Sequence, residues 1–427
     1  MQVLSEELAV QGYTSLLFHS SEMNSSHSHN TQHESAWLET ILRKAFHESS
    51  ISRVVKVTKE EIGVKGDNYV SCITRVTLEI IQNSGRKSKK TLILKCPLDL
   101  FMPMPVFKLE VKVYENILSE FNALMNEFQD PNEAVWCEMI GHQPYDIIAL
   151  EDLKAANFKV ADRKNLLDMN HTLLVLNGLG RLHGISHVLI QRGVISPNDL
   201  GVDLVSPDCP FASRIVEGGF DQLACVMEEF WPPEWKEVAK KFAKLSKVAM
   251  EKIKNIMDYT KDTFLVMNHG DCWTCNMMFK YSPYEESRPI AVKFIDWPFA
   301  NVNSYILDIT RLLGECMHPE IRRQNIDILY RAYQKSLAST LEFYGMPGIA
   351  PTLEQIYAEA KRAECLEILY STVFLAVVIE DFPGFYIDKT FTPCEAKECF
   401  NADIFKTETF RKLIEAEIKR WVEEGII

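Results

Sequence analysis

The sequence pattern changes from strand-like to helix-like at about residue 155, and this change restricts the possible folds more than any other feature. Before it, short runs rich in Val, Ile and Thr alternate with turn residues, a pattern typical of β-strands. After it, apolar residues recur at helical spacing over long segments. We therefore predict an α+β, bilobal chain with a small β-rich N-lobe and a large helical C-lobe. The expected strands are 52–57, 69–82, 91–95, 147–150, 277–280 and 292–295, and the expected long helices are 171–187, 235–258, 311–344, 353–378 and 409–424.

The beginning of the chain has a composition that disfavours folding. Residues 19–34 are rich in Ser, His and Asn and contain almost no apolar side chains. Such a segment buries too little surface to offset the entropy lost on ordering. We expect a flexible tail over residues 1–34, an N-lobe over 35–153 and a C-lobe over 154–427.

Charge and cysteine content narrow the class of protein. The formal net charge is -13, whereas a nucleic-acid-binding protein needs a basic surface, so we expect no nucleic-acid partner. The eleven cysteines follow no disulfide framework, and the first residues do not resemble a signal peptide, which together favour a cytoplasmic protein. The most apolar run, 373–379, is too short to cross a bilayer, so we expect no membrane association. The sequence does not specify an oligomeric state.

The most specific motif is His269-Gly270-Asp271, with Asn276 five residues after the aspartate. The two short strands that follow predict a hairpin, which returns the chain to Asn276 and ends at Asp296. Phosphoryl transfer needs such a cluster: one carboxylate to orient a hydroxyl and accept its proton, and oxygen ligands for Mg²⁺. We assign Asp271, His269 and Asn276 as candidate catalytic residues, and Asn276 and Asp296 as candidate metal ligands. The alternative is a polar turn with incidental acids.

A second cluster is predicted from Glu110, a charged residue at a position where an apolar side chain is expected. Glu110 falls on the apolar stripe of the helix expected after residue 106, and a buried carboxylate is costly unless it is paired. Lys95, which ends an apolar strand, is the natural partner. A lysine in this place could hold the phosphates of ATP, although a lysine extending from a strand end to solvent would look the same.

Two weaker segments complete the candidate nucleotide site. The turn-rich loop that contains Gly66, Asn68 and Ser71 could bring backbone N–H groups close to phosphate, but an ordinary hairpin turn fits equally well. Glu151 and Leu153 lie where the lobes should join, so nearby backbone groups could bind adenine. A plain linker is the alternative there.

Three further features have less specific interpretations. His183 lies on the Leu-rich face of a long helix and is best explained as a hydrogen-bonded core histidine. Asp308 is expected to cap or brace a helix beside the catalytic loop. The aromatic-rich stretches 211–235 and 382–391 suit a flat apolar ligand, and equally suit an ordinary core.

Together these motifs resemble the insect ecdysteroid kinase-like family, a branch of the choline kinase and aminoglycoside phosphotransferase group with a protein-kinase-like fold. The resemblance runs from about residue 37 to the C-terminus. Its markers are GDNYVS (66–71), LILK (92–95), FKLEVKVYENIL (107–118), LEDL (150–153), LGRLHGIS (179–186), NHGDCWTCNMMFKY (268–281) and FIDW (294–297) followed by Asp308.

The resemblance implies roles for the motif residues. It implies that Asp271 is the catalytic base and that Asn276 and Asp296 bind Mg²⁺. It also implies that Lys95 and Glu110 position the phosphates of ATP. Family members phosphorylate hydroxyl groups of small molecules, among them ecdysteroids. The expected function is therefore ATP-dependent phosphorylation of a small-molecule acceptor, an ecdysteroid or a xenobiotic alcohol.

The chain departs from the family pattern at two places. Trp297-Pro298 follows the candidate metal aspartate where Phe-Gln is usual, and Cys275 stands where Asn is common. Neither change removes a catalytic group, but the first could reshape the pocket beside Asp296. No long activation loop follows Asp296, which favours a small acceptor over a protein.

Two rival functions remain open at this point. His269, Cys272 and Cys275 have a ligand-like H-x-x-C-x-x-C spacing, but a structural zinc site needs a fourth ligand, and none with suitable spacing accompanies them. The other rival is a pseudokinase that binds nucleotide or ligand without turnover. Against it, the base, the metal aspartate and the lysine are all present.

Overall fold

The computed structural model describes residues 31–45, 51–62, 71–98, 106–143 and 147–427. Most of the tail predicted for residues 1–34 lies outside this range. The first described helix, α2 (Thr31–Ala45), begins within the predicted tail, so the last four residues of that segment are helical. The chain divides into two compact units: residues 1–59 with 76–90, and residues 60–75 with 91–427.

The smaller unit contains α2 and parts of three strands, β1 (Ile51–Ile62), β2 (Ser71–Gln82) and β3 (Lys87–Pro97). Along β2, Val76, Leu78 and Ile80 are buried and their neighbours are not, the alternation expected of a sheet covered on one face. The predicted basic turn after Gln82 joins β2 to β3 through hydrogen bonds between Gln82 and Arg86 (2.9 Å) and between Gly85 and Gln82 (2.8 Å).

Strands β2 and β3 continue into the larger unit. The sheet has the order β1-β2-β3-β5-β4, completed by β5 (Ile147–Glu151) and β4 (Met139–Gln143). Strands β3 and β5 are antiparallel, with Lys95 opposite Ile148. The helical segment that follows β3 consists of α3 (Val106–Lys112), the π-helical turn η2 (Val113–Ile117) and α4 (Leu118–Glu127).

The remainder of the larger unit is mainly helical, which confirms the α+β prediction. The expected helix 311–344 is wrong as a single element, because the chain breaks before Pro319, which begins a new helix at its first position. The expected helix 353–378 is likewise divided into shorter segments. The helical segments are α5 (Met169–Gln191), α6 (Ala212–Phe230), α7 (Lys236–Met257), α8 (Ile306–Glu315), α9 (Pro319–Phe343), α10 (Leu353–Arg362), α11 (Glu364–Leu369), the π-helical η7 (Tyr370–Phe374), α12 (Leu375–Ile379), α13 (Asp403–Lys406) and α14 (Glu408–Glu423).

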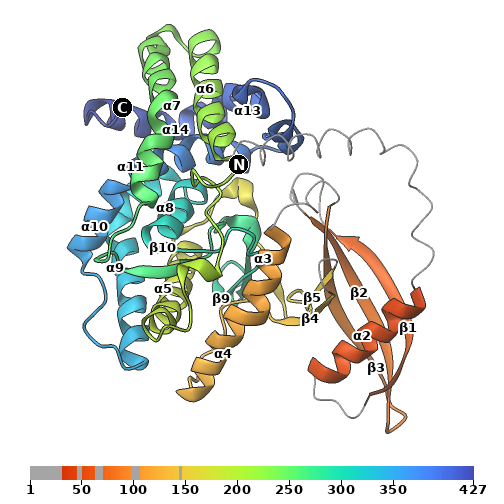
Figure 1. Cartoon of the computed structure of the whole chain (residues 1–427). Helices are drawn as coiled ribbons and strands as arrows, with labels where there is room; N and C mark the ends of the chain where they lie inside the picture. Colours follow the sequence, from red (N-terminus) through yellow and green to blue (C-terminus); the bar gives the residue numbers. More distant parts are fainter. Residues whose placement is uncertain (1–30, 46–50, 63–70, 99–105, 144–146) are drawn as a thin grey trace, which may run out of the picture. The chain divides into compact units, whose positions relative to one another are not determined.

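Two helix pairs form much of this unit (Figure 1): α5 packs on α9, and α6 packs on α7. The close approach of α5 to α9 depends on small residues, because a Cβ atom at Gly180 or Gly184 would lie 2.7 Å from Ser336 or Thr340, respectively.

Helix α5 is long and apolar enough to cross a membrane, but 72% of that stretch is buried. Buried core helices of soluble proteins can have the same length and apolar composition.

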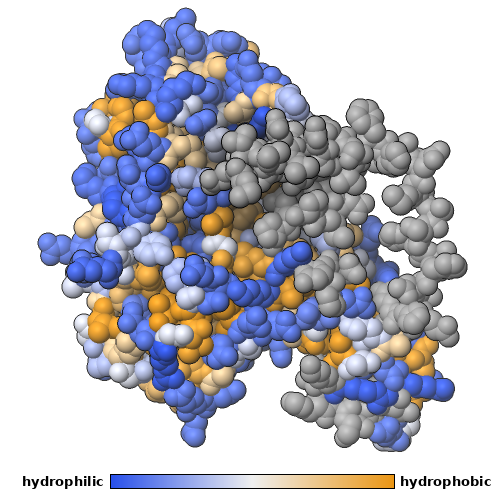
Figure 2. All heavy atoms as spheres, in the orientation of Figure 1, coloured by the Kyte–Doolittle hydropathy of each residue, from blue (hydrophilic) through white to orange (hydrophobic). Residues whose placement is uncertain are grey.

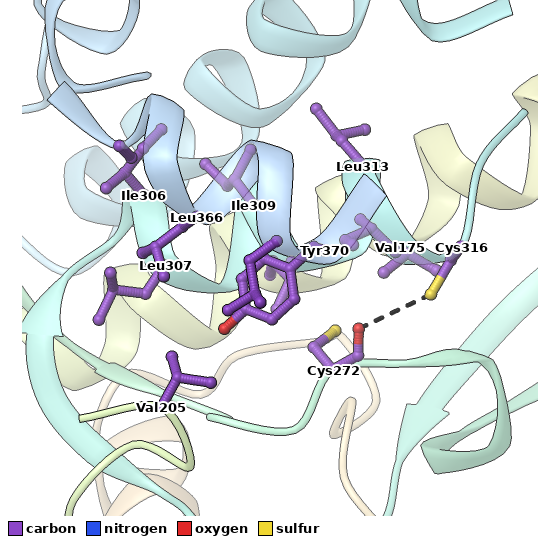
Figure 3. Packing of buried hydrophobic residues seen from close by; sticks show 14 of the residues in the cluster. Val175, Val205, Cys272, Ile306, Leu307, Ile309, Leu313, Cys316, Leu366 and Tyr370 are labelled. Carbon is purple, nitrogen blue, oxygen red and sulfur yellow. Dashed lines mark hydrogen bonds between the residues drawn. The ribbon is translucent and has the colours of Figure 1, made fainter. Parts of the chain in front are cut away.

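The core continues around α8. Figure 3 shows the ring of Tyr370 in one cluster with Val205, Leu307 and Cys272, and the thiol of Cys316 lies 3.9 Å from the carbonyl oxygen of Cys272. All five of these side chains are buried. Hydrophilic side chains dominate the surface over α6 and α7, at the top of Figure 2. Cys272, inside the candidate catalytic motif, is thus part of the packed core.

Short strands bring the two ends of the candidate site together. Strand β7 (Leu265–Asn268), which precedes the motif, pairs with β10 (Asn301–Ser304). The predicted hairpin is present as β8 (Met277–Tyr281) and β9 (Pro289–Phe294), with Met277 opposite Phe294, and β6 (Phe158–Val160) pairs with β8. As a result, the N–H of Ile295 donates a 3.0 Å hydrogen bond to the carbonyl of Asn276.

Candidate active site

One buried carboxylate holds the backbone of the candidate catalytic loop, residues 269–276. Asp308, on α8, accepts hydrogen bonds from the N–H groups of His269 (2.6 Å) and Gly270 (3.0 Å). Its other contact is His183 Nε2 at 3.2 Å, and His183 Nδ1 in turn contacts the Tyr333 hydroxyl at 2.9 Å. Asp308 thus braces the loop, and His183 is a hydrogen-bonded core residue, as the sequence indicates. These hydrogen bonds lower the pKa of Asp308, although burial alone would raise it.

The loop turns at Gly270, where only glycine fits. Its φ is +76°, and a Cβ atom there would lie 2.0 Å from the carbonyl oxygen of Phe299. Any other residue would displace the chain that follows Asp296.

Asp271 makes two strong contacts through its side chain. One carboxylate oxygen lies 2.5 Å from Arg311 Nη2, and the other accepts a 2.7 Å hydrogen bond from the amide of Asn276. Burial raises the pKa of Asp271, and the positive charge of Arg311 opposes this effect. The carboxylate is therefore oriented from both sides, as a residue that receives a proton from a bound hydroxyl should be.

Arg311 is a site residue that sequence reasoning missed. It is buried on α8 and also donates to the Gly270 carbonyl (3.0 Å) and to Glu315 (3.0 Å). Its guanidinium lies over the rings of Tyr370 and Phe374. The helical spacing of Arg311 and Glu315 was visible in the sequence, but their proximity to Asp271 was not.

His269 faces the fold and lines neither of the cavities described below. Its Nε2 contacts the Ile295 carbonyl at 3.0 Å, and its Nδ1 accepts a 3.3 Å hydrogen bond from the Asp271 N–H. Burial lowers the pKa of His269, which favours the neutral ring that this pattern requires. His269 therefore positions the backbone beside Asp271 and Asp296. Both of its ring nitrogens are used in these contacts, so it is not placed to contact a reacting group.

Asn276 and Asp296 offer oxygen atoms to one cavity. Asn276 uses its amide nitrogen to bind Asp271, which leaves its carbonyl oxygen for another partner. Asp296 has a φ of +67°, a strained conformation for a residue other than glycine, and its Oδ1 lies 2.6 Å from Lys95 Nζ. An amide oxygen and a carboxylate are hard ligands of the kind that Mg²⁺ prefers, so the donor set fits this ion.

Lys95 and Glu110 lie together as the sequence predicts. Lys95 Nζ donates to both carboxylate oxygens of Glu110, at 2.8 and 2.7 Å, and both residues are buried. Burial raises the pKa of Glu110 to about 7, although Lys95 opposes the shift. Burial alone would lower the pKa of Lys95, but the charges of Asp296 and Glu110 outweigh it and raise this pKa. Lys95 therefore stays charged between two carboxylates.

These groups line a cavity of 440 Å³, which we call the Lys95 cavity. Its walls include Lys95, Glu110, Asn276 and Asp296, together with residues 150–154 at the end of β5. A volume of this order is typical of small-ligand sites. The lysine predicted to bind ATP and the predicted metal ligands therefore line one cavity.

The predicted hinge residues also border the Lys95 cavity. The Glu151 carboxylate accepts from Lys293 (2.6 Å) and from the Glu138 N–H (2.9 Å), so its side chain is engaged by protein groups. Leu153 is buried. An ion pair that the sequence did not suggest, between Arg75 and Asp152 (3.0 Å), borders the same cavity.

The predicted phosphate loop is only partly described. Gly66 and Asn68 lie outside the described residues. Ser71 begins β2 and is buried, and it does not line the Lys95 cavity.

A second cavity, of 150 Å³, has Asp271 in its wall, and we call it the Asp271 cavity. Its polar groups include Asp271, Arg311 and Glu315. Most of the remaining wall is apolar and includes Phe211, Ile215, Trp273, Phe374, Phe385 and Phe400. The aromatic stretches noted in the sequence thus contribute both to the core and to this cavity.

The structure accounts for Trp297, which departs from the family pattern, and for the possible zinc ligands. Trp297 is fully buried, packs on the His269 ring at 4.3 Å and lines neither cavity. Within the described residues, no group of three or more His, Cys, Asp or Glu side chains is arranged to hold a metal ion. Since His269 uses both ring nitrogens for backbone contacts, the H-x-x-C-x-x-C spacing does not form a ligand set.

The sequence profile of the ecdysteroid kinase-like family matches residues 65–346, which is more than half of the chain. The chain belongs to the ecdysteroid kinase-like family. The matched region includes the β3 strand with Lys95, the catalytic loop and the hairpin that ends at Asp296. A search of curated proteins found no match. Membership of the ecdysteroid kinase-like family suggests a kinase-like phosphotransferase that acts on small molecules and uses ATP, typically with Mg²⁺.

Proposed function

We propose that this ecdysteroid kinase-like protein transfers the γ-phosphoryl group of ATP to a hydroxyl group of a small, largely apolar alcohol. One observation carries the proposal: Asn276, in the wall of the Lys95 cavity, is hydrogen-bonded to Asp271, in the wall of the Asp271 cavity. The proposed phosphate-side and acceptor-side pockets are thus connected by two candidate catalytic residues that are hydrogen-bonded to each other.

The Lys95 cavity is the proposed nucleotide site. Lys95 would bind phosphate oxygens, and Glu110 would hold the lysine in place. Residues 150–154 would border the adenine, with backbone groups near Leu153 as its partners. The arrangement supports a bilobal protein-kinase-like fold, in which residues 35–153 form the N-lobe and residues 154–427 the C-lobe.

Asn276 Oδ1 and the Asp296 carboxylate are the proposed ligands of Mg²⁺. Bound there, the ion would neutralise charge on the phosphates during transfer. Lys95 already occupies one oxygen of Asp296 and brings a positive charge to the same place. The positive φ of Asp296 points to a conformation maintained for function.

Asp271 is the proposed base. An acceptor hydroxyl in the Asp271 cavity would donate a hydrogen bond to the carboxylate and pass its proton to it as the phosphoryl group arrives. Asn276 and Arg311 fix the direction of the carboxylate. The apolar walls exclude water, which would otherwise compete as the phosphoryl acceptor.

The size of the Asp271 cavity limits the acceptor. An engineered apolar cavity of about 150 Å³ in another protein binds benzene, so this one accommodates about one six-membered ring. We propose an acceptor whose hydroxyl is attached to such a ring or to a short alkyl group. An ecdysteroid would have to place one ring in the cavity and the rest outside it.

The test is incubation with Mg·ATP and a panel of apolar alcohols that increase in size from one ring to a steroid. Phosphorylated product is measured by mass spectrometry. We expect product with the wild type, none with Asp271→Asn, and unchanged turnover with Asp262→Asn, a matched change at an exposed position. ATP binding to Asp271→Asn should persist, because Asp271 does not line the Lys95 cavity.

The main competing function is a pseudokinase. It predicts that the wild type binds Mg·ATP and phosphorylates no member of the panel. Two retained sets of contacts favour the enzyme: Lys95 binds Glu110 and Asp296, and Asn276 binds Asp271.

A further inference from the structure

Two cysteines near the C-terminus share one arginine. Arg214, on α6, donates through the same nitrogen to Cys394 Sγ at 3.2 Å and to Cys399 Sγ at 3.8 Å. The two thiols also make a hydrogen-bonding contact with each other. A guanidinium group beside a thiol stabilises the thiolate, which is the reactive form. Burial raises the pKa of Cys399, and the hydrogen bond and charge of Arg214 oppose this rise.

This cysteine pair lies in the segment that forms part of the Asp271 cavity. Phe385 and Phe400 are both in the cavity wall, and they form an isolated antiparallel bridge with ring centroids 5.0 Å apart. The Tyr386 N–H donates a 2.8 Å hydrogen bond to the Cys399 carbonyl, next to that bridge. Arg214 also binds the Lys389 carbonyl at 3.1 Å. One arginine thus connects the two thiols to the backbone of the cavity wall.

We propose that Cys394 and Cys399 form a reactive thiol pair that a peroxide closes into a disulfide, and that this closure restrains the wall of the Asp271 cavity. The pair is distinct from the candidate phosphotransfer residues, and its chemistry does not depend on the proposed kinase function. Both cysteines are free thiols in this structure.

The reaction balances with peroxide as the oxidant. Cys394 is partly exposed and Cys399 is buried, so Cys394 meets the peroxide first. Its thiolate attacks one peroxide oxygen, the O–O bond breaks, and a sulfenic acid and one water molecule form. The Cys399 thiolate then attacks the Cys394 sulfur, the S–S bond forms, and a second water molecule leaves. Two thiols lose two electrons and two protons, and hydrogen peroxide is reduced to water.

The chain contains a convenient reporter of this bond. Trypsin cleaves after Lys397, between the two cysteines, so a disulfide would hold together two peptides that reduction separates. The full-length protein is reduced, desalted, treated with hydrogen peroxide, blocked with iodoacetamide and digested. We expect the linked peptide pair in the wild type and in Cys225→Ser, a control on α6, and its loss in Cys394→Ser and Cys399→Ser.

Arg214 provides a second test. Arg214→Gln should slow formation of the linked pair about tenfold, the change expected if loss of the guanidinium raises the pKa of Cys399 by about one further unit. Arg192→Gln, a change of a surface arginine that pairs with Glu127, should leave the rate unchanged. An unaltered rate in Arg214→Gln would overturn the role of the guanidinium.

The restraint of the wall is measured separately by hydrogen exchange. Peroxide should slow amide exchange over residues 385–400 in the wild type and not in Cys399→Ser. The proposal is overturned if the exposed Cys72 is oxidised while Cys394 and Cys399 stay unlinked, or if Cys394 pairs with Cys225 instead. Equal exchange before and after linkage would overturn the restraint of the wall.

Discussion

The guanidinium of Arg311 lies 2.5 Å from the carboxylate of Asp271, inside the wall of an apolar cavity. The same side chain binds Glu315 and the Gly270 carbonyl, so it connects the candidate base to the helix beneath it. Asp271, Arg311 and Glu315 therefore form one network of buried charges.

Replacing Arg311 should destabilise the protein strongly. Arg311→Met leaves Asp271 and Glu315 buried without their counter-charge, which typically costs about 3–5 kcal/mol. Arg331→Met, which breaks an exposed ion pair with Asp327, should cost less than about 1 kcal/mol. Urea unfolding of both variants measures the difference. Similar losses for the two would show that the buried network contributes no more than a surface ion pair.

Replacing Lys95 should impair both ATP binding and folding. Lys95→Met removes the charge that contacts Glu110 and Asp296. Loss of one partner of a buried charge pair should lower the free energy of unfolding by about 2–5 kcal/mol. Because the same charge is proposed to hold phosphate, ATP affinity measured by calorimetry should fall at least tenfold. Lys240→Met, at an exposed position, is the control. Normal ATP affinity in Lys95→Met would place the nucleotide elsewhere.

Glycine at position 270 should be required for the catalytic loop. Gly270→Ala combines a positive φ with a contact of 2.0 Å to the Phe299 carbonyl, whereas Gly85→Ala has a φ of +80° and open space. Gly85→Ala should cost about 1–2 kcal/mol from the backbone alone. Gly270→Ala should cost clearly more and abolish phosphotransfer. Thermal unfolding compares the two, and equal losses would contradict the clash.

The stability of the protein should depend on pH through Asp203. Burial raises the pKa of this carboxyl from its ordinary value to about 6, with Arg311 opposing the rise and Asp308 and Asp271 adding to it. The folded state therefore holds the proton more tightly than the unfolded state. Its contribution to stability is fully present below the unfolded pKa, near 4, and is lost as the pH rises through about 6.

Asp203→Asn should remove that part of the pH dependence. The free energy of unfolding, measured by urea titration from pH 4 to pH 7, should fall less steeply in Asp203→Asn than in the wild type. Asp208→Asn changes an exposed aspartate of the same loop and should keep the wild-type slope. An unchanged slope in Asp203→Asn would exclude this carboxyl as the source.

Several parts of the fold and site were predictable because they depend on local pattern. The strand that contains Lys95, the helix that carries Glu110 and the hairpin from Met277 to Phe294 each follow from the spacing of apolar residues and from turn residues. The Lys95–Glu110 contact was predictable for a further reason. A charged residue on an apolar stripe needs a partner, and few were available.

Helix boundaries were less predictable. The segment from Arg311 to Tyr344 has continuous helical periodicity, yet the structure divides it before Pro319. Periodicity reports which face is buried and does not report where the axis changes direction, so two packed helices and one long helix give similar patterns.

Local pattern was sufficient to predict most of the strands and helices and to select the loop from His269 to Asn276 as the candidate site, because hydrogen-bonded segments and turns impose short, regular spacings. The packed chain alone decided that Arg311 would hold Asp271, that Trp297 would be buried away from both cavities, and that Arg214 would join Cys394 to Cys399. These contacts join residues from separate helices and loops. Their geometry depends on how those elements pack, which no spacing along the sequence records.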